Sequence, residues 1–169
     1  VSTIVCAQIS TVTTQLRVDC HAVRNITPPA AILQLLRSFK RARYAALTYV
    51  SGRSCLPYLE PFLETIRCGE TSGVVTQRAL CAVLTIMRGE LLAQDAETAP
   101  RAISNIVIAA TTCRFEVTDP AADEVVLQCI IELLHGCIAC SSGSMLSDQS
   151  VHAVFYSCFR ISSQANLSE

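Results

Sequence analysis

The stretch that decides the fold is Thr112-Cys-Arg-Phe-Glu-Val-Thr-Asp-Pro-Ala-Ala-Asp-Glu-Val-Val-Leu-Gln-Cys-Ile-Ile-Glu-Leu-Leu134. Asp119 is suited to cap a helix N-terminus, and Pro120 suits the first helical position, where a missing N–H group loses no hydrogen bond. Asp123 and Glu124 follow in the first turn, where negative charge meets the positive end of the helix dipole. The stretch predicts a helix to about residue 140 with one apolar stripe, made of Leu127, Ile130, Ile131, Leu134 and Ile138.

The same apolar spacing predicts helices in the rest of the chain, over residues 1–23, 29–47, 55–67, 75–92, 100–113 and from Ser147 onward. Pro61 lies inside the third of these and is expected to bend it or to displace its start. Helix pairs at roughly 40-residue spacing suggest hairpins stacked side by side. We therefore predict an all-α, armadillo- or HEAT-like right-handed solenoid of about seven helices, with a closed helical bundle as the alternative.

The fourth and last helices have apolar stripes of their own. The fourth is expected to bury Leu80, Val83, Leu84, Met87 and Leu91. Ser147 is expected to cap the last helix, whose buried face is predicted to consist of Val151, Val154, Phe155, Cys158 and Phe159.

Length and composition indicate one globular domain over residues 1–169. The chain is 51% hydrophobic and 16% charged, which excludes a disordered polypeptide. No apolar run reaches the roughly 18–20 residues of a membrane span, so we expect a soluble protein. The first residue is Val1, no signal peptide pattern follows, and the last residues carry no terminating signal. We therefore expect this chain to be a piece of a longer polypeptide.

The ten cysteines predict free thiols in a cytosolic protein, because several of them occupy apolar stripes as small hydrophobic residues. Cys137 and Cys140 form a CxxC motif beside His135. Zinc normally requires four such ligands, and thioredoxin-like chemistry places CxxC after a strand, so we interpret this motif as structural. We expect neither a metal nor a cofactor.

No residues suggest catalysis. His21 and His152 lack the neighbours of a catalytic triad, and the turn at residues 69–73 lacks the phosphate-loop pattern. We therefore do not expect an enzyme.

Charge is divided unevenly along the chain. Residues 1–55 hold seven basic residues against Asp19 alone, a net charge of +6, and the remainder carries −7. Such a division favours antiparallel self-association or docking on a complementary partner, although ordinary solvated helix faces would also account for it. The second helix concentrates positive charge, which suits anionic lipid or a small GTPase, at Arg37, Lys40, Arg41 and Arg43. Nucleic acid is disfavoured, because no exposed aromatic residues are expected among these cations.

Three blocks of the chain resemble one protein family. They are Arg114–Leu127, then Tyr58–Arg67 with the following Glu70-Thr-Ser-Gly73, and Leu146–Val151 with Ser157–Ile161. These blocks resemble the N-terminal region of the large Arf guanine-nucleotide exchange factors of the Golgi brefeldin A-resistance and GNOM type. Residues 1–50 match in helical pattern alone.

The resemblance implies a dimerisation and cyclophilin-binding (DCB) domain with an armadillo-like fold. It implies a cytoplasmic protein at Golgi or endosomal membranes that pairs with itself and docks on the neighbouring homology-upstream (HUS) domain. A cyclophilin or a small GTPase is a further implied partner. The family's exchange domain is absent from this sequence, so no exchange activity is expected. In relatives, a basic residue in the fourth helix and an acidic one at Glu124 are linked to pairing; here the basic position is Thr85.

Overall fold

The computed structural model describes residues 2–22, 28–48, 54–89, 92, 97–113, 120–141 and 143–165. These residues form α-helices and a short 3-10 turn, η1 (Gly143–Met145), with no β-strand among them. The α-helices are α1 (Ser2–Ala22), α2 (Ala30–Leu47), α3 (Leu56–Arg67), α4 (Gly73–Arg88), α5 (Ala99–Thr111), α6 (Pro120–Ala139) and α7 (Asp148–Ala165). The prediction of an all-α fold is confirmed.

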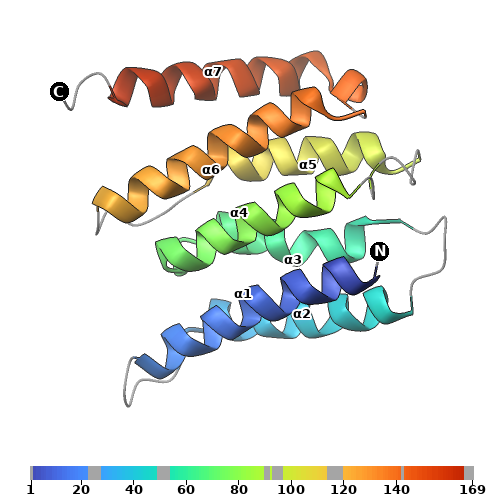
Figure 1. Cartoon of the computed structure of the whole chain (residues 1–169), viewed down its shortest axis with the longest axis vertical. Helices are drawn as coiled ribbons and strands as arrows, with labels where there is room; N and C mark the ends of the chain where they lie inside the picture. Colours follow the sequence, from blue (N-terminus) through green and yellow to red (C-terminus); the bar gives the residue numbers. More distant parts are fainter. Residues whose placement is uncertain are drawn as a thin grey trace.

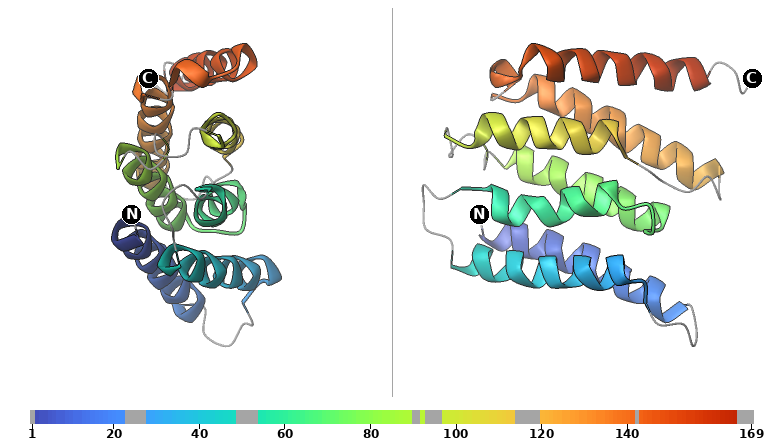
Figure 2. Two further views of the ribbon diagram at one scale, coloured as in Figure 1. Left: turned by 90° about the vertical axis from the view of Figure 1, so that its right-hand side faces the viewer. Right: turned by 180° about the vertical axis from the view of Figure 1, so that it is seen from behind.

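The helices stack in two layers (Figures 1 and 2). One layer consists of α1, α4 and α6, and the other of α2, α3, α5 and α7, with neighbours within each layer in contact. Helices consecutive in sequence form hairpins between the layers: α1 with α2, α3 with α4, and α5 with α6. The first hairpin and α7 lie at opposite ends of the stack. The described part of the chain is therefore an open, solenoid-like array, as predicted, and not the closed bundle.

The core lies between the layers and is densest at α3, α4 and α5. Phe62 of α3 is fully buried and meets Phe39 of α2 edge to face, with ring centroids 5.1 Å apart and an interplanar angle of 75°. Ile103 and Ile106 of α5 are also fully buried.

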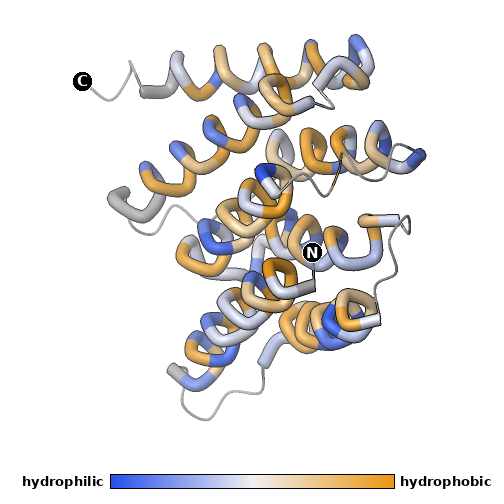
Figure 3. The backbone as a smooth tube through the Cα atoms, turned by 45° about the vertical axis from the view of Figure 1, so that its right-hand side comes forward, coloured by the Kyte–Doolittle hydropathy of each residue, from blue (hydrophilic) through white to orange (hydrophobic). Residues whose placement is uncertain are grey.

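Polar and apolar residues are interspersed along every described helix (Figure 3). None of the described helices has the length and apolar content needed to cross a membrane.

The connection between α3 and α4 is held by hydroxyl groups. The Ser72 Oγ accepts a hydrogen bond from the Val75 N–H at 3.3 Å and so caps α4, while the Ser72 hydroxyl donates to the Asp19 carboxylate on α1. The buried Thr71 hydroxyl donates to the Cys68 carbonyl at 2.9 Å and lies 3.1 Å from the Thr76 hydroxyl. This connection joins three helices: α1, α3 and α4.

Helix boundaries match the predictions closely, with two corrections. Helix α4 begins at Gly73 and ends at Arg88, so the predicted range of 75–92 is shifted, because Ser72 provides the cap that sets the start. Helix α3 begins at Leu56 and runs through the buried Pro61, so the prediction that Pro61 displaces the start of this helix is wrong.

Helix α6 begins at Pro120 as predicted, while the cap at Asp119 and the predicted core residue Leu91 lie outside the described residues. Ser147 caps α7 as predicted: its Oγ accepts from the Ser150 N–H at 3.2 Å.

The buried faces of α6 and α7 differ from the predicted ones. Ile131 and Ile138 of α6 are 43% and 46% exposed, and Phe155 and Phe159 of α7 are 57% and 72% exposed. The predicted burial of Ile130 and Leu134 on α6 and of Val154 on α7 is confirmed. The core further includes residues that were not predicted: Val126, Leu133, Cys137 and Ile161. The error arises because both helices have more apolar residues than one face can hold, so sequence spacing cannot choose between two overlapping stripes.

Candidate interaction surface

Helices α4 and α6 lie side by side in one layer and run in the same direction (Figure 1). The outward residues of α4 recur at helical spacing and are all exposed: Arg78, Cys81, Thr85 and Arg88. The outward residues of α6 are likewise exposed: Glu124, Gln128, Glu132 and His135. We call these eight residues the α4–α6 face.

Charge on the α4–α6 face is separated by helix. The arginines Arg78 and Arg88 lie on α4, and the glutamates Glu124 and Glu132 lie on α6. Within the described part of the chain, the only ion pair joins Arg67 to Glu60 at 2.6 Å. Glu132 accepts a hydrogen bond from Gln128 at 3.2 Å, one turn earlier on its own helix. A basic stripe therefore lies beside an acidic stripe, and neither is neutralised by the other.

The two residues that the resemblance linked to pairing lie on this face but apart from each other. Because Cys81 contacts Cys129 and the helices are parallel, this contact sets their register. Thr85 lies four residues after Cys81, and Glu124 lies five residues before Cys129, so they are roughly 13 Å apart along the helix axes at 1.5 Å per residue. The Thr85 hydroxyl donates to the Cys81 carbonyl of its own helix at 2.8 Å. The side chain of Asp123 lies outside the described residues.

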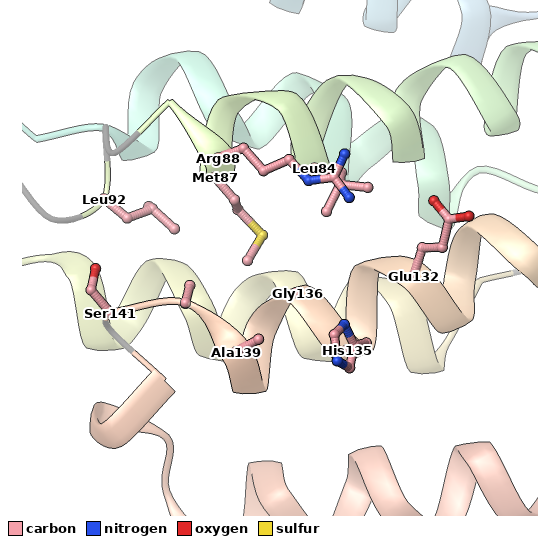
Figure 4. Close-up of a pocket in the computed structure, with 10 residues that line it drawn as sticks. Leu84, Met87, Arg88, Leu92, Glu132, His135, Gly136, Ala139 and Ser141 are labelled. Atoms are coloured by element: carbon pink, nitrogen blue, oxygen red, sulfur yellow. The ribbon is translucent and has the colours of Figure 1, made fainter.

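A groove of about 360 Å³ opens where the C-terminal halves of α4 and α6 meet (Figure 4). Its floor is apolar, with Leu84 and Met87 facing Gly136, and its rim carries Arg88, Glu132 and His135. A Cβ atom on Gly136 would lie 3.0 Å from the Leu84 Cδ1, so glycine permits this close approach of the helices. The groove extends the α4–α6 face and joins its charged rim to an apolar floor.

The two cysteines of the CxxC motif at the end of α6 are a buried thiol, Cys137, and a half-buried thiol, Cys140. Cys137 is fully buried on α6, and burial raises the pKa of its thiol to about 12. The Cys140 thiol donates to the Cys137 carbonyl at 3.4 Å, within the same helix end. All ten cysteines are free. In the described part of the chain, no three potential ligands from His, Cys, Asp and Glu gather at one point.

The basic cluster predicted on the second helix is exposed at the end of the array. Arg37, Lys40, Arg41 and Arg43 all face solvent on α2, which contains no acidic residue. Arg41 Nη2 donates to Ser38 at 3.2 Å, and the described residues provide no ion pair to any of the four cations. Tyr44 is 72% exposed, and Leu47 is exposed as well. The expectation that no exposed aromatic residue stands among these cations is therefore wrong.

The opposite end of the array exposes aromatic side chains. Helix α7 is the last helix of its layer, and its outer face carries Phe155, Tyr156 and Phe159, all exposed. Met145 of η1 is exposed nearby in sequence. Contiguous exposed aromatic residues of this kind mark interaction surfaces more often than solvated ones.

Sequence reasoning missed Arg78 and Arg88 as site residues. Both are on the outward side of α4 with Thr85, and Arg88 is one turn away from it. The signal was present in the sequence, since positions 78, 81, 85 and 88 recur at helical spacing outside the apolar stripe. These arginines give α4 the positive charge that Thr85 does not supply.

Comparison with known proteins relates the chain to one class of regulators. No family model matches it, and no solved structure does. It is 41% identical over 137 residues to the ARF guanine-nucleotide exchange factor GNOM of Arabidopsis thaliana, covering 81% of this chain and 9% of that protein. It is 33% identical over 135 residues to GNL1 of the same plant, covering 78% and 9%.

An animal relative extends this similarity. The chain is 33% identical over 112 residues to the Golgi-specific brefeldin A-resistance guanine nucleotide exchange factor 1 homolog of Caenorhabditis elegans, covering 66% of this chain and 6% of that protein. The chain thus spans less than a tenth of the length of these relatives. The homologues of this chain are therefore Arf guanine-nucleotide exchange factors, and the chain corresponds to one segment of such a protein.

Proposed function

We propose that this chain is the DCB domain of an Arf guanine-nucleotide exchange factor, a non-catalytic module that pairs two copies and docks on the adjacent HUS domain. Its homologues are Arf exchange factors, of which it corresponds to less than a tenth. In this proposal the exchange reaction belongs to another part of the protein. The whole protein acts in the cytoplasm, at the surface of Golgi or endosomal membranes, during vesicle traffic.

The observation that carries the pairing is the charge separation on the α4–α6 face. A two-fold axis between the two helices, parallel to both, would lay α4 of one copy over α6 of the other. The arginines of each copy would then face the glutamates of its partner, because a two-fold interface is self-complementary. The groove adds apolar surface at one end of such a contact, between the C-terminal halves of the two helices. A rotation about this axis keeps each residue at its height along the helices, so Thr85 would face Glu132 of the second copy and would stay roughly 13 Å from Glu124 along the axis.

A charge-swap experiment tests this pairing. The variant Arg78→Glu/Arg88→Glu and the variant Glu124→Lys/Glu132→Lys are expected to sediment as monomers at concentrations where the unchanged chain is paired. Each variant places like charges across the interface, which costs association energy. Mixed in equal amounts, the two variants are expected to restore a dimer, because each supplies what the other lacks. High salt should weaken both the original and the mixed dimer.

Arg101→Glu on α5 is the matched control, since it reverses an exposed arginine outside the α4–α6 face. Pairing that survives both double variants, or that is lost equally in the control, would exclude this face. A monomer at all concentrations would exclude pairing by this chain altogether.

Docking on the HUS domain is proposed to use the exposed aromatic face of α7. This helix ends the array, so another helical hairpin can stack on it without disturbing the core. Phe155→Ala/Phe159→Ala is expected to abolish binding of the purified HUS segment while leaving the pairing through α4 and α6 intact. Binding that is unaffected by this change would contradict the role of α7. A cyclophilin or a small GTPase remains a further proposed partner, to be tested with the same variants.

A second candidate function is attachment to an anionic membrane surface through α2. The observation that favours it is that the four cations of α2 are exposed together with Tyr44 and Leu47, a combination suited to the headgroup region. Flotation with vesicles containing phosphatidylserine is expected to recover the unchanged chain at low salt. Arg37→Glu/Arg41→Glu/Arg43→Glu should remain unbound, and an unchanged recovery of that variant would reject this function.

A further inference from the structure

Two cysteines from different helices meet at the surface of the α4–α6 face. The Cys81 Sγ lies 3.7 Å from the Cys129 Sγ, although the two residues are 48 positions apart in sequence. Cys81 is exposed and Cys129 is half-buried. Two small apolar side chains in contact would stabilise the core if both were buried. Cys129 is packed partly against the core, but Cys81 is exposed, so this contact removes little of the Cys81 surface from water and core packing alone does not account for it.

We propose that Cys81 and Cys129 form a dithiol site that is converted to a disulfide bond between α4 and α6 by a small-molecule disulfide such as oxidised glutathione. A disulfide requires the sulfurs to approach to about 2.05 Å, which is reached by rotation of the two side chains and a small approach of the helices. The inference rests on this geometry and does not depend on the proposed function.

The reaction proceeds by two exchanges. The Cys81 thiolate attacks one sulfur of oxidised glutathione, its S–S bond breaks, and one glutathione leaves as a thiolate that takes up a proton. The Cys129 thiol then loses its proton to solvent, and its sulfur attacks the Cys81 sulfur, releasing the second glutathione. The protein thiols are oxidised by two electrons in total, and one glutathione disulfide is reduced to two thiols.

The exposure of Cys81 and the raised pKa of Cys129 determine the order of these two steps. Cys81 is the exposed thiol, so the oxidant reaches it first. Burial, followed by the proximity of Cys81 and of Glu132, raises the pKa of Cys129 to about 12. Cys129 is therefore the second, slower thiol, and the closing step is expected to accelerate as pH rises above neutrality.

The bond would tie the middle of α4 to the middle of α6. These helices carry the basic and acidic stripes, so the disulfide would fix the distance between them. It would also enclose α5 and the connections on both sides in one covalent loop.

The experiment is oxidation of the whole chain with increasing ratios of oxidised to reduced glutathione, followed by peptide mapping under non-reducing conditions. We expect a Cys81–Cys129 linkage to be the first to appear, and its rate of formation from the mixed disulfide to rise up to tenfold per pH unit between pH 7 and 9. Persistent glutathione on Cys81 beside a free Cys129, a different first linkage, or no reaction at Cys81 would each overturn the proposal.

Two single variants and one control resolve the steps. Cys129→Ser is expected to stop at the mixed disulfide on Cys81. In the Cys81→Ser variant, glutathione should add to Cys129 at least tenfold more slowly than it adds to Cys81 in the unchanged chain, because Cys129 is the less accessible thiol. Cys158→Ser on α7, which changes another half-buried cysteine, is expected to leave the linkage and its rate unchanged. Circular dichroism before oxidation verifies folding, and the map of the unchanged chain decides the outcome even if a variant fails to fold.

Discussion

The centre of the array and its two ends use the same kind of helix in different ways. Seven of the 12 residues of α3 are buried, because α3 has neighbours on both sides within its layer and α4 behind it. On α7, by contrast, the described buried residues are limited to Ser150, Val154, Ser157 and Ile161. The difference follows from position: a terminal helix of a stacked array has a neighbour on one side alone.

This comparison distinguishes residues that stabilise the fold from residues that are available to bind a partner. Apolar residues at the centre are enclosed and hold the fold, whereas those at the ends, such as Tyr44 and Phe159, face solvent. An exposed aromatic residue contributes little to folding, so its presence calls for another explanation, and contact with a partner supplies one. Four predictions test how sharp this division is.

The largest effect is expected at the centre. Phe62→Ala removes a fully buried ring and its edge-to-face contact with Phe39, and should lower the free energy of unfolding by about 3–5 kcal/mol. The matched control, Phe159→Ala at the end of the array, should change it by less than about 0.5 kcal/mol. Urea denaturation followed by circular dichroism measures both. Equal losses would show that α7 is as enclosed as α3 and would remove the basis of the comparison.

Alkaline pH should lower the free energy of unfolding through the buried thiol of Cys137. Burial raises the pKa of Cys137 from 9.0 to about 12, so its stabilising contribution is complete below pH 9 and is lost between pH 9 and 12, as the unfolded chain releases this proton first. The free energy of unfolding should fall by up to about 1.4 kcal/mol per pH unit from this thiol. Cys137→Ala should make that decline shallower, whereas Cys158→Ala should not. Identical slopes in all three chains would contradict the assignment.

A smaller effect is expected where the centre joins the first helix. Ser72→Ala removes the cap of α4 and the hydrogen bond to Asp19 of α1, at a cost of about 1 kcal/mol. Asp19→Ala keeps the cap and removes the link between helices, and should cost less. Thermal unfolding of both variants measures the difference, and a loss for Asp19→Ala of more than half the loss for Ser72→Ala would mean that the link matters more than the cap.

The smallest effect on folding is expected at Thr85, which is exposed although it belongs to a central helix. Thr85→Lys adds a positive charge to the basic stripe and should change the free energy of unfolding by less than about 0.5 kcal/mol. The same change should lower the concentration at which two copies pair, as sedimentation would show. Thr85→Glu is the opposite control, and weaker pairing with lysine would argue against a contact with the glutamates of α6.

The sequence was sufficient to predict where the helices lie and which residues form most of the core. Residues such as Val83 and Leu84 of α4 lie in a single apolar stripe, and a single stripe has one way to be buried. It was insufficient where a helix has two overlapping stripes, as at Ile131 and Phe155. Which stripe faces inward depends on neighbours that come from distant parts of the chain, and local spacing contains no information about them.

The candidate site was predictable in part for the same reason. Glu124 and the cations of α2 are recognisable from the sequence as exposed charges. That Arg78 and Arg88 stand beside the glutamates of α6 is a consequence of how α4 and α6 pack, which no local pattern encodes. The contact between Cys81 and Cys129 likewise joins residues that local spacing cannot relate.

The placement of α1 next to α4 has a consequence for synthesis on the ribosome. The acceptor surface for α1 is made about 50 residues after α1 ends, a delay of roughly 3–10 s at ordinary rates of translation. During that interval α2 can cover one side of α1, while the side that contacts α4 stays uncovered until α4 is made. The weak helix formers of α1, rich in threonine and valine, would keep this early segment from committing to a structure before its partner exists. The hairpin of α1 and α2 is thus made before α4 and completes its packing after α4 has been made.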